Sequence, residues 1–210
     1  MKKYTTTSGF FERQNERRIL KRRKRNKFVF YAIGIIVFIC MVFCAYEFGS
    51  NLGQKIKYPV SYSRYIVKYS EENNLDPYLV IAMIRQESNF VSDARSPYAG
   101  GLMQLTEVTA NEYAGKMGLT DFDYMDPETN IQIGCFVMSS LIEKYDNVDT
   151  ALAAYNAGVG NVDKWLSNPE ITDHLGKLKN IPFNETELYV KKVTTTYKIY
   201  KKIYEEGNNE

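Results

Sequence analysis

One stretch of the chain limits its fold more than any other: the nineteen uncharged residues from 28 to 46. They read FVFYAIGIIVFICMVFCAY. As a helix that rises about 1.5 Å per residue, this stretch is roughly 28 Å long, close to the thickness of the hydrocarbon core of a bilayer. We therefore predict a transmembrane helix over residues 28–48.

The residues before this stretch are strongly basic. Eleven lysines and arginines against two glutamates give residues 1–27 a formal charge of +9, and because the whole chain carries +2, the remainder sums to −7. Basic residues beside an apolar span mark its cytoplasmic side. We expect residues 1–27 to form a cytoplasmic tail and everything after residue 48 to lie outside the membrane. The tail has little aromatic interleaving and no packed domain of its own, so we expect no nucleic-acid binding.

Two other interpretations of this N-terminus fit the residues less well. A cleaved signal peptide has an apolar run of about 7 to 15 residues and a small-x-small cleavage pattern, whereas this run is longer and Ala45 stands alone. Lipidation of Cys44 is disfavoured because Val42 and Phe43 occupy positions where a lipoprotein signal has a small residue. We expect an uncleaved, single-span anchor in the cell membrane.

The exported part offers few residues for metal or nucleophilic chemistry. Cys40 and Cys44 lie within the apolar run, so Cys135 is the only cysteine beyond it and no internal disulfide can form there. The single histidine, His174, stands in a polar stretch and is interpreted as a surface loop residue. With no His/Cys cluster, we expect no metal and no cofactor, and a Ser-His-Asp arrangement is improbable.

The exported part reads as helices with polar breaks and no convincing alternating strand. Two Asp-Pro pairs, at residues 76–77 and 126–127, each combine an N-cap residue with a proline in the first turn. Asn184 and Glu187 resemble a capping box that opens a last helix. We assign residues 49–60 to a linker and residues 61–206 to one compact, mainly helical domain.

Glu87 is placed unusually for a charged residue. In a helix that begins at Pro77, Val80, Met83, Ile84 and Glu87 stand at i, i+3, i+4 and i+7, so the carboxyl falls on the apolar face. Burial raises the pKa of a glutamate, which suits a group that must hold a proton and deliver it to a leaving oxygen. The alternative is an exposed Glu87, or one paired with a basic residue such as Arg85, because glutamates on helix surfaces are common. From this residue alone, the alternative is favoured.

Four stretches of the exported part change this balance. They are ESNF (87–90), ARSPYAGGLMQLT (94–106), AAYNAGVGNV (153–162) and IPFNETELYVKKV (181–193). In this order and at these separations they resemble the catalytic domain of the soluble lytic transglycosylase family, which cleaves the glycan strands of bacterial peptidoglycan. The resemblance covers about residues 60–205 and implies a lysozyme-like, mainly α-helical fold.

The resemblance also implies roles for individual residues. The catalytic acid of the family falls on Glu87, and the substrate-binding positions fall on the following residues: Ser96, Gln104, Tyr155, Asn156 and Tyr189. The chain departs from the family in the loop before Leu102, which has one residue fewer than usual. We expect Gly100 and Gly101 to allow this tighter path; if one of them takes a positive φ, alanine there should cost stability or activity, on the order of 1 kcal/mol or more.

These residues also have plain structural explanations. Tyr155 and Tyr189 can be core aromatics, and Asn156 with Gly158 can simply end a helix. The chain contains seventeen tyrosines, so one tyrosine alone indicates little. The functional interpretation depends on the chemistry of carbohydrate sites, which use flat apolar faces with hydroxyl and amide groups at their edges.

The number of candidate acids bears on the mechanism. Ordinary glycosidases use two carboxyl groups about 5 to 9.5 Å apart, whereas here only Glu87 lies in a motif, and Asp93 matches no required family position. The resemblance implies a single-acid reaction that leaves a 1,6-anhydromuramic acid end. Three functions stay open: a lytic transglycosylase, which we favour, a hydrolysing muramidase of the same fold, and a non-catalytic cell-wall-binding protein. The expected partners are peptidoglycan glycan strands and the membrane, and no motif indicates a protein partner.

Overall fold

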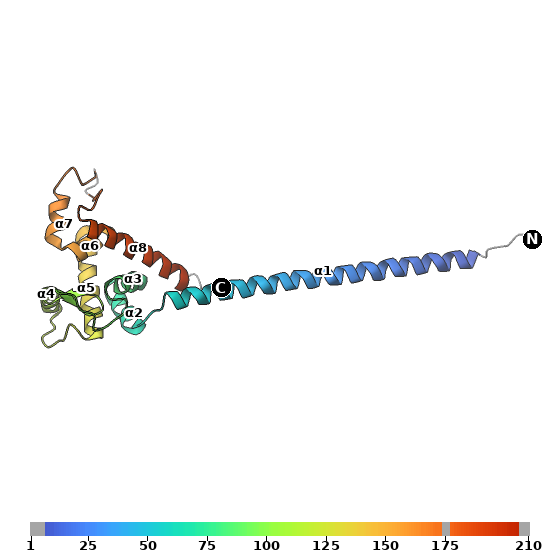
Figure 1. Ribbon diagram of the computed structural model, residues 1–210, viewed down its shortest axis with the longest axis horizontal. Helices are drawn as coiled ribbons and strands as arrows, with labels where there is room; N and C mark the ends of the chain where they lie inside the picture. The colour runs from blue at the N-terminus through green and yellow to red at the C-terminus, as the bar shows by residue number, and fades with distance from the viewer. Residues whose placement is uncertain (1–6, 174–176, 206–210) are drawn as a thin grey trace, which may run out of the picture. The chain divides into compact units, whose positions relative to one another are not determined.

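The computed structural model describes residues 7–173 and 177–205 (Figure 1). The chain divides into two compact units, residues 1–56 and residues 57–210. In chain order the elements are α1 (Thr7–Lys57), α2 (Ser63–Glu72), α3 (Pro77–Glu87), β1 (Ala99–Gly100), β2 (Leu105–Thr106), α4 (Glu107–Met117), α5 (Pro127–Tyr145), α6 (Val148–Ala157), α7 (Val159–Leu166) and α8 (Asn184–Tyr204).

The first unit consists of α1. Its segment Phe28–Tyr46 has a mean hydropathy of 2.8 and is the one helical segment, among the described residues, that is long and apolar enough to cross a membrane. The apolar side chains described in this segment are exposed. The segment matches the length that a helix needs to span the hydrocarbon core of a bilayer. The segment predicted as a linker, residues 49–60, is helical as far as Lys57.

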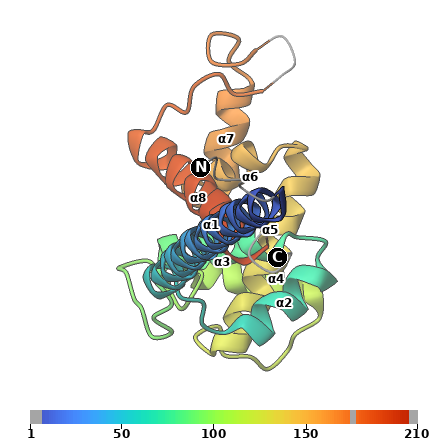
Figure 2. The ribbon, with the colours of Figure 1, turned by 90° about the vertical axis from the view of Figure 1, so that its right-hand side faces the viewer.

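The second unit is a bundle built around α3 and α5. The six residues 79–84 of α3 are all buried, so this helix is covered on every side along that stretch. It packs against α2 and α8, while α5 packs against α2, α4 and α6 (Figure 1). Helix α6 also contacts α8 and α7, and Figure 2 shows α7 at the end of this unit opposite α2. This mainly helical arrangement agrees with the predicted fold class.

The two Asp-Pro pairs start helices as predicted. The Asp76 carboxylate accepts a hydrogen bond from the Tyr78 backbone N–H at 2.9 Å, and Pro77 occupies the first turn of α3. The Asp126 carboxylate accepts one from the Thr129 N–H at 3.0 Å at the start of α5. Each cap satisfies a backbone donor that the helix itself leaves unpaired.

The predicted capping box at the start of α8 is wrong. The residue in the N-cap position is Phe183, which offers no side-chain cap, and Asn184 is already the first helical residue. The Glu187 N–H instead donates to the Phe183 carbonyl at 2.9 Å, as an ordinary helical bond. Helix α8 ends at Tyr204, and the predicted end at residue 206 lies outside the described residues, as does His174.

A small hairpin that the sequence did not indicate lies between α3 and α4. Strands β1 and β2 are antiparallel, with Ala99 opposite Thr106 and Gly100 opposite Leu105. Two residues per strand are too few to produce a recognisable alternation of polar and apolar residues. The hairpin matters for function because its connecting residues, 101–104, carry part of the motif that contains Gln104.

Candidate active site

Glu87 is the last residue of α3 and is half-buried. It shares a helix face with the fully buried Val80, Met83 and Ile84, as the spacing predicts. No ion pair among the described residues involves Glu87. The alternative partner, Arg85, instead donates hydrogen bonds elsewhere, so the carboxyl of Glu87 has no neighbouring positive charge to neutralise it.

The surroundings of Glu87 keep it protonated to unusually high pH. Burial raises the pKa of its carboxyl from the ordinary 4.5 to about 7, and Tyr189 opposes a small part of this rise. Burial has this effect because it penalises the charged form of an acid. At neutral pH the carboxyl is therefore divided between its protonated and ionised forms, which is the condition for both giving and accepting a proton.

Two tyrosines from other helices face this carboxyl: Tyr155 of α6 and Tyr189 of α8. Burial raises the pKa of both well above the ordinary 10.0, and the charge of Glu87 raises each further, so both stay protonated. The Tyr155 hydroxyl donates to the Met103 carbonyl at 2.9 Å. The Tyr189 hydroxyl is buried and makes no hydrogen bond of ordinary geometry with any described residue. Leaving a buried hydroxyl without a well-formed hydrogen bond costs about 1–3 kcal/mol.

The chain turns sharply as it leaves α3. The Ser88 hydroxyl lies 2.8 Å from the Leu102 carbonyl and 3.1 Å from the Ile84 carbonyl, which ties the end of α3 to the hairpin loop. The next two residues, Asn89 and Phe90, have φ angles of 49° and 65°. This left-handed conformation is uncommon for a bulky residue such as phenylalanine and costs roughly 1–2 kcal/mol. The strain lies directly beside the acid, where backbone strain is often found in functional sites.

Asn130 of α5 holds the hairpin loop, and sequence reasoning missed it. It is fully buried, and its amide oxygen accepts a hydrogen bond from the Met103 N–H at 2.7 Å. Its amide nitrogen donates to the carbonyls of Gly100 at 3.1 Å and Tyr124 at 2.7 Å. The signal available in the sequence was a single amide beside Ile131 on the inner face of a helix that is otherwise apolar there.

The space around Gly100 and Gly101 explains why two adjacent glycines occur in this loop. Gly101 has a φ of +80°, and a Cβ added there would collide with the side chain of Asn130. A Cβ at Gly100 would meet the sulfur of Met125. At Gly101 the shortened loop therefore depends on a positive φ and a close approach to α5 that favour glycine, whereas the contact at Gly100 is with the flexible end of a side chain.

The side chains of Ser96 and Gln104 form hydrogen bonds with backbone groups of their own loop. The Ser96 hydroxyl accepts from the Ala99 N–H at 3.0 Å, and Ser96 is exposed. The Gln104 amide nitrogen donates to the Gly101 carbonyl at 2.9 Å and to the Ala94 carbonyl at 3.1 Å. Gln104 also has a left-handed φ of 48°. Both side chains shape the loop, and their predicted contacts with substrate stay a prediction.

A cavity of about 470 Å³ lies between the hairpin and helices α4, α5 and α6. Gln104 and Tyr155 line it, together with Thr106, Tyr113 and Val159 from three other elements. Its volume is in the range of pockets that hold small ligands. Glu87 does not line this cavity, but the Glu87 charge acts on Tyr155. We take Tyr155 as the link between the acid and the cavity.

Asn156 lines a different hollow, of about 580 Å³, at the start of α8. Its amide oxygen accepts a hydrogen bond from the Thr186 hydroxyl at 2.8 Å, which joins α6 to α8. The structure therefore brings Glu87, Tyr155 and Tyr189 together, and it does not place Asn156 with them. The predicted contact of Asn156 with substrate stays a prediction.

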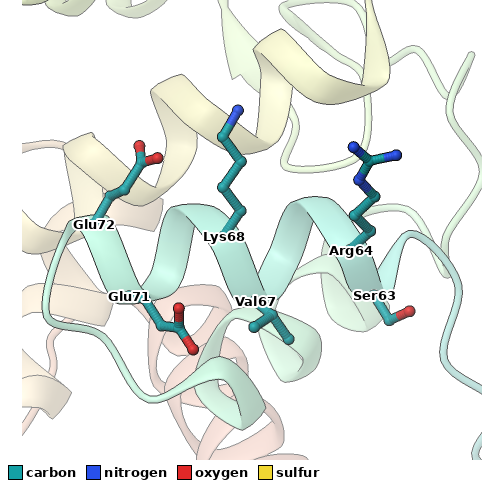
Figure 3. A pocket seen from close by; sticks show the side chains of 6 residues that line it. All are labelled: Ser63, Arg64, Val67, Lys68, Glu71 and Glu72. Carbon is teal, nitrogen blue, oxygen red and sulfur yellow. The ribbon is translucent and has the colours of Figure 1, made fainter.

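A third hollow, of about 570 Å³, lies along the outer face of α2 and shares no lining residue with the other two (Figure 3). Its lining contains Arg64, Lys68, Glu71 and Glu72, a mixed set of exposed charges. Among the described residues, no group of three or more histidine, cysteine or acidic side chains is arranged to hold a metal ion.

The mainly helical second unit, with the half-buried Glu87 at a helix end and tyrosines of two further helices beside it, has the lysozyme-like fold of the solved lytic transglycosylases that it resembles. Comparison with known proteins identifies the family within this fold class. The chain belongs to the transglycosylase SLT domain family, whose model matches residues 64–175, just over half of the chain.

The relatives are lytic transglycosylases. The soluble lytic murein transglycosylase of Salmonella typhimurium is 33% identical over 144 residues, which are 65% of this chain and 22% of that protein. A membrane-bound lytic murein transglycosylase F from Desulfosudis oleivorans is 32% identical over 171 residues, covering 65% of this chain and 35% of that protein. This chain thus spans about a fifth to a third of the length of these relatives.

Solved structures show the same likeness. The 70 kDa soluble lytic transglycosylase of Escherichia coli superposes with a TM-score of 0.64 at 31% identity, over 70% of this chain and 25% of that one. An inactive Glu-to-Gln variant of the lytic transglycosylase Slt from Pseudomonas aeruginosa gives a TM-score of 0.63 at 34% identity, with the same coverage.

Proposed function

We propose that this chain is a membrane-anchored lytic transglycosylase that cleaves the β-1,4 bond between N-acetylmuramic acid and N-acetylglucosamine in peptidoglycan. The observation that carries the proposal is the half-buried Glu87, with a pKa of about 7, facing Tyr155 and Tyr189. Family membership and the lytic transglycosylases among its relatives support it.

The reaction needs one acid that acts twice. Protonated Glu87 donates its proton to the bridging oxygen as the bond from that oxygen to C1 of the muramic acid breaks. The N-acetyl group of the muramic acid shields the positive charge that develops at C1. The C6 hydroxyl of the same sugar then attacks C1, and ionised Glu87 removes the proton of that hydroxyl. The new C1–O6 bond closes a 1,6-anhydro ring, and no water is consumed.

The surroundings of Glu87 favour this single-acid reaction over hydrolysis by two carboxyls. A second carboxylate close to Glu87 would raise its pKa by repulsion. Among the described residues, burial raises this pKa and Tyr189 lowers it, and no acidic side chain contributes. The Tyr189 hydroxyl, which faces Glu87 and makes no hydrogen bond of ordinary geometry with a described residue, is available to hold an oxygen of the reacting sugar.

Product analysis tests the proposal. The full chain in detergent micelles is incubated with purified peptidoglycan in heavy-oxygen water, and the fragments are examined by mass spectrometry. We expect muramic acid ends that are one water lighter than reducing ends and that carry no heavy oxygen. Reducing ends that contain heavy oxygen would identify a hydrolysing muramidase instead. Binding to peptidoglycan without any cleavage would identify the non-catalytic alternative.

The proposed topology has residues 1–27 in the cytoplasm and the second unit outside the membrane. It is supported by the +9 charge of the N-terminal segment and by the apolar helical segment Phe28–Tyr46. Protease added to intact protoplasts should remove the second unit. Protection of that unit, or its release with a new N-terminus near Ala45, would contradict this topology.

A further inference from the structure

The chain that enters the second unit is bound to it by three consecutive backbone carbonyls, those of residues 57–59. Each accepts a hydrogen bond from a side chain of α3 or α8. The donors, in chain order of the carbonyls, are Arg85 Nη2 at 3.2 Å, Tyr204 Oη at 2.7 Å and Tyr200 Oη at 3.0 Å. This segment is therefore an integral part of the unit.

The side chain of Tyr58 completes this contact. The Arg85 guanidinium lies 4.7 Å from the centroid of the Tyr58 ring, a distance at which a cation is attracted to an aromatic face. The Tyr58 ring also meets the ring of Tyr200 edge-on, with centroids 5.8 Å apart. Arg85 Nη1 donates to the Tyr200 hydroxyl at 3.1 Å, and Tyr200 is fully buried. We refer to Tyr58, Arg85 and Tyr200 as the entry cluster.

The entry cluster lies on the two helices that carry the acid and its unpaired tyrosine. Arg85 is two residues before Glu87 in the last turn of α3, and Tyr200 is on α8, the helix of Tyr189. The residue after Glu87 is fixed separately, by the bond from Ser88 to the Leu102 carbonyl. A catalytic group must be held within about 0.5 Å of its productive position. The last turn of α3 is thus restrained on both sides of the acid.

We propose that the entry cluster positions Glu87 for catalysis, so that the segment directly after the membrane helix is part of the catalytic framework. The inference rests on the proposed function of Glu87 as the acid. Tyr58 and Arg85 are positioning residues, because neither touches the reacting atoms. Burial and Tyr189 account for the pKa of Glu87, so Arg85 acts through the backbone of α3 and not through its charge.

Two pairs of variants of the full chain in detergent micelles test this inference. Tyr58→Ala removes the ring, whereas Tyr58→Phe keeps it. Arg85→Lys loses the planar fork that joins three partners, and Arg64→Lys makes the same change at an exposed position on α2 (Figure 3). On soluble glycan strands, we expect Tyr58→Ala and Arg85→Lys to lower kcat about tenfold or more, since small misplacements of reacting groups are costly. We expect KM to change less than about twofold, and both control variants to behave as wild type.

A second measurement does not depend on cleavage. The apparent pKa of Glu87 can be followed by carbon NMR of labelled glutamate, with assignment by Glu87→Gln. The titratable groups that face Glu87 are Tyr155 and Tyr189, which titrate well above its range. If the entry cluster positions the last turn of α3, its loss admits water to the carboxyl, and the pKa of Glu87 falls in Tyr58→Ala and Arg85→Lys but not in Tyr58→Phe.

The outcomes separate this inference from the proposed function. Variants with a lower melting temperature but an unchanged kcat and an unchanged Glu87 pKa would show that the cluster is only structural, and would overturn the inference. If Tyr58→Ala does not fold, Arg85→Lys decides the question. If the wild type yields reducing ends or no cleavage, the proposed function fails, while the Glu87 titration in the variants still supports or overturns the positioning role.

Discussion

Helix α3 has a carboxyl at each end, and each lies beside a tyrosine of α8. At the start, the Asp76 carboxylate accepts hydrogen bonds from the Tyr197 hydroxyl at 2.7 Å and from Lys201 Nζ at 3.1 Å. At the end, Glu87 faces Tyr189, whose buried hydroxyl has no hydrogen-bond partner of ordinary geometry among the described residues. The helices α3 and α8 thus support two carboxyl–tyrosine contacts. The one at Asp76 has a well-formed hydrogen bond, and the one at Glu87 does not.

The difference is visible in the proton affinity of the two acids. Burial alone would raise the pKa of Asp76, but hydrogen bonds from Tyr197, from the Tyr78 N–H and from Lys201 outweigh it and lower that pKa. For Glu87 burial prevails, and the pKa rises to about 7. Asp76 is therefore satisfied and ionised, as a structural cap should be, whereas Glu87 has no ion-pair partner among the described residues and is able to exchange a proton near neutral pH.

The largest effect that this comparison predicts is at Glu87. Glu87→Gln keeps the size and polarity of the side chain but cannot give up and take back a proton, so cleavage should fall by roughly 10² to 10⁴. The fold should be retained, with a melting temperature equal to or slightly above that of wild type, because an unpaired buried carboxyl destabilises the folded state. Digestion of purified peptidoglycan and thermal melts measure both. Cleavage at the wild-type level would remove Glu87 from the mechanism, and loss of folding would indicate a structural role.

Substitution of the two α8 tyrosines, Tyr189 and Tyr197, should separate effects on stability from effects on activity. Tyr189→Phe removes a buried hydroxyl that makes no hydrogen bond of ordinary geometry with a described residue, so stability should be unchanged or slightly higher, while cleavage should fall about tenfold if that hydroxyl bonds the substrate. Tyr197→Phe removes a hydrogen bond to a charged acceptor and should cost about 1.5–3 kcal/mol of unfolding free energy, with cleavage retained in the protein that remains folded. Urea unfolding followed by the fluorescence of Trp165, the single tryptophan, measures stability. Equal effects of Tyr189→Phe and Tyr197→Phe on stability and on cleavage would show that the two tyrosines do not have different roles.

The smallest expected effect is at Asp76. Asp76→Asn can still cap α3 but loses the charge that attracts Lys201, so the unfolding free energy should fall by about 1 kcal/mol. Cleavage should stay within about twofold of wild type. The same urea unfolding and digestion assays apply, with Glu87→Gln as the matched isosteric change at the other end of α3. An Asp76→Asn protein that is stable yet inactive would show that the two ends of the helix do not differ in the way argued here.

Local patterns predicted much of this comparison. An Asp-Pro pair specifies a helix start within two residues, so the cap at Asp76 followed from the sequence. The period of the helix placed Glu87 on the apolar face. The prediction of Asn184 as the N-cap residue of α8 was wrong by one position. The N-cap residue is Phe183, and Asn184 is the first residue of the helix.

Groups that meet only after folding were not predictable in the same way. Asn130 bonds the backbone of residues 100 and 103, and nothing adjacent to it in sequence identifies those partners. Tyr58 and Tyr200 lie near opposite ends of the second unit in sequence, yet their rings are in contact in the folded structure. The motifs named Ser96 and Gln104 as substrate residues, and only the structure showed that both also bond within their own loop.

The central claim, that burial without an ion-pair partner raises the pKa of Glu87, is tested most directly by the pH dependence of stability. The measurement is the difference in unfolding free energy between wild type and Glu87→Gln, because other groups cancel in it. The folded-state pKa of about 7 exceeds the ordinary value of 4.5, so the contribution of this carboxyl is fully present below about pH 4.5 and is lost as the pH rises through about 7. We predict that wild type loses about 1 to 3 kcal/mol relative to the variant across this window. A difference that does not change with pH, or one in which wild type gains on the variant as the pH rises, would contradict the account.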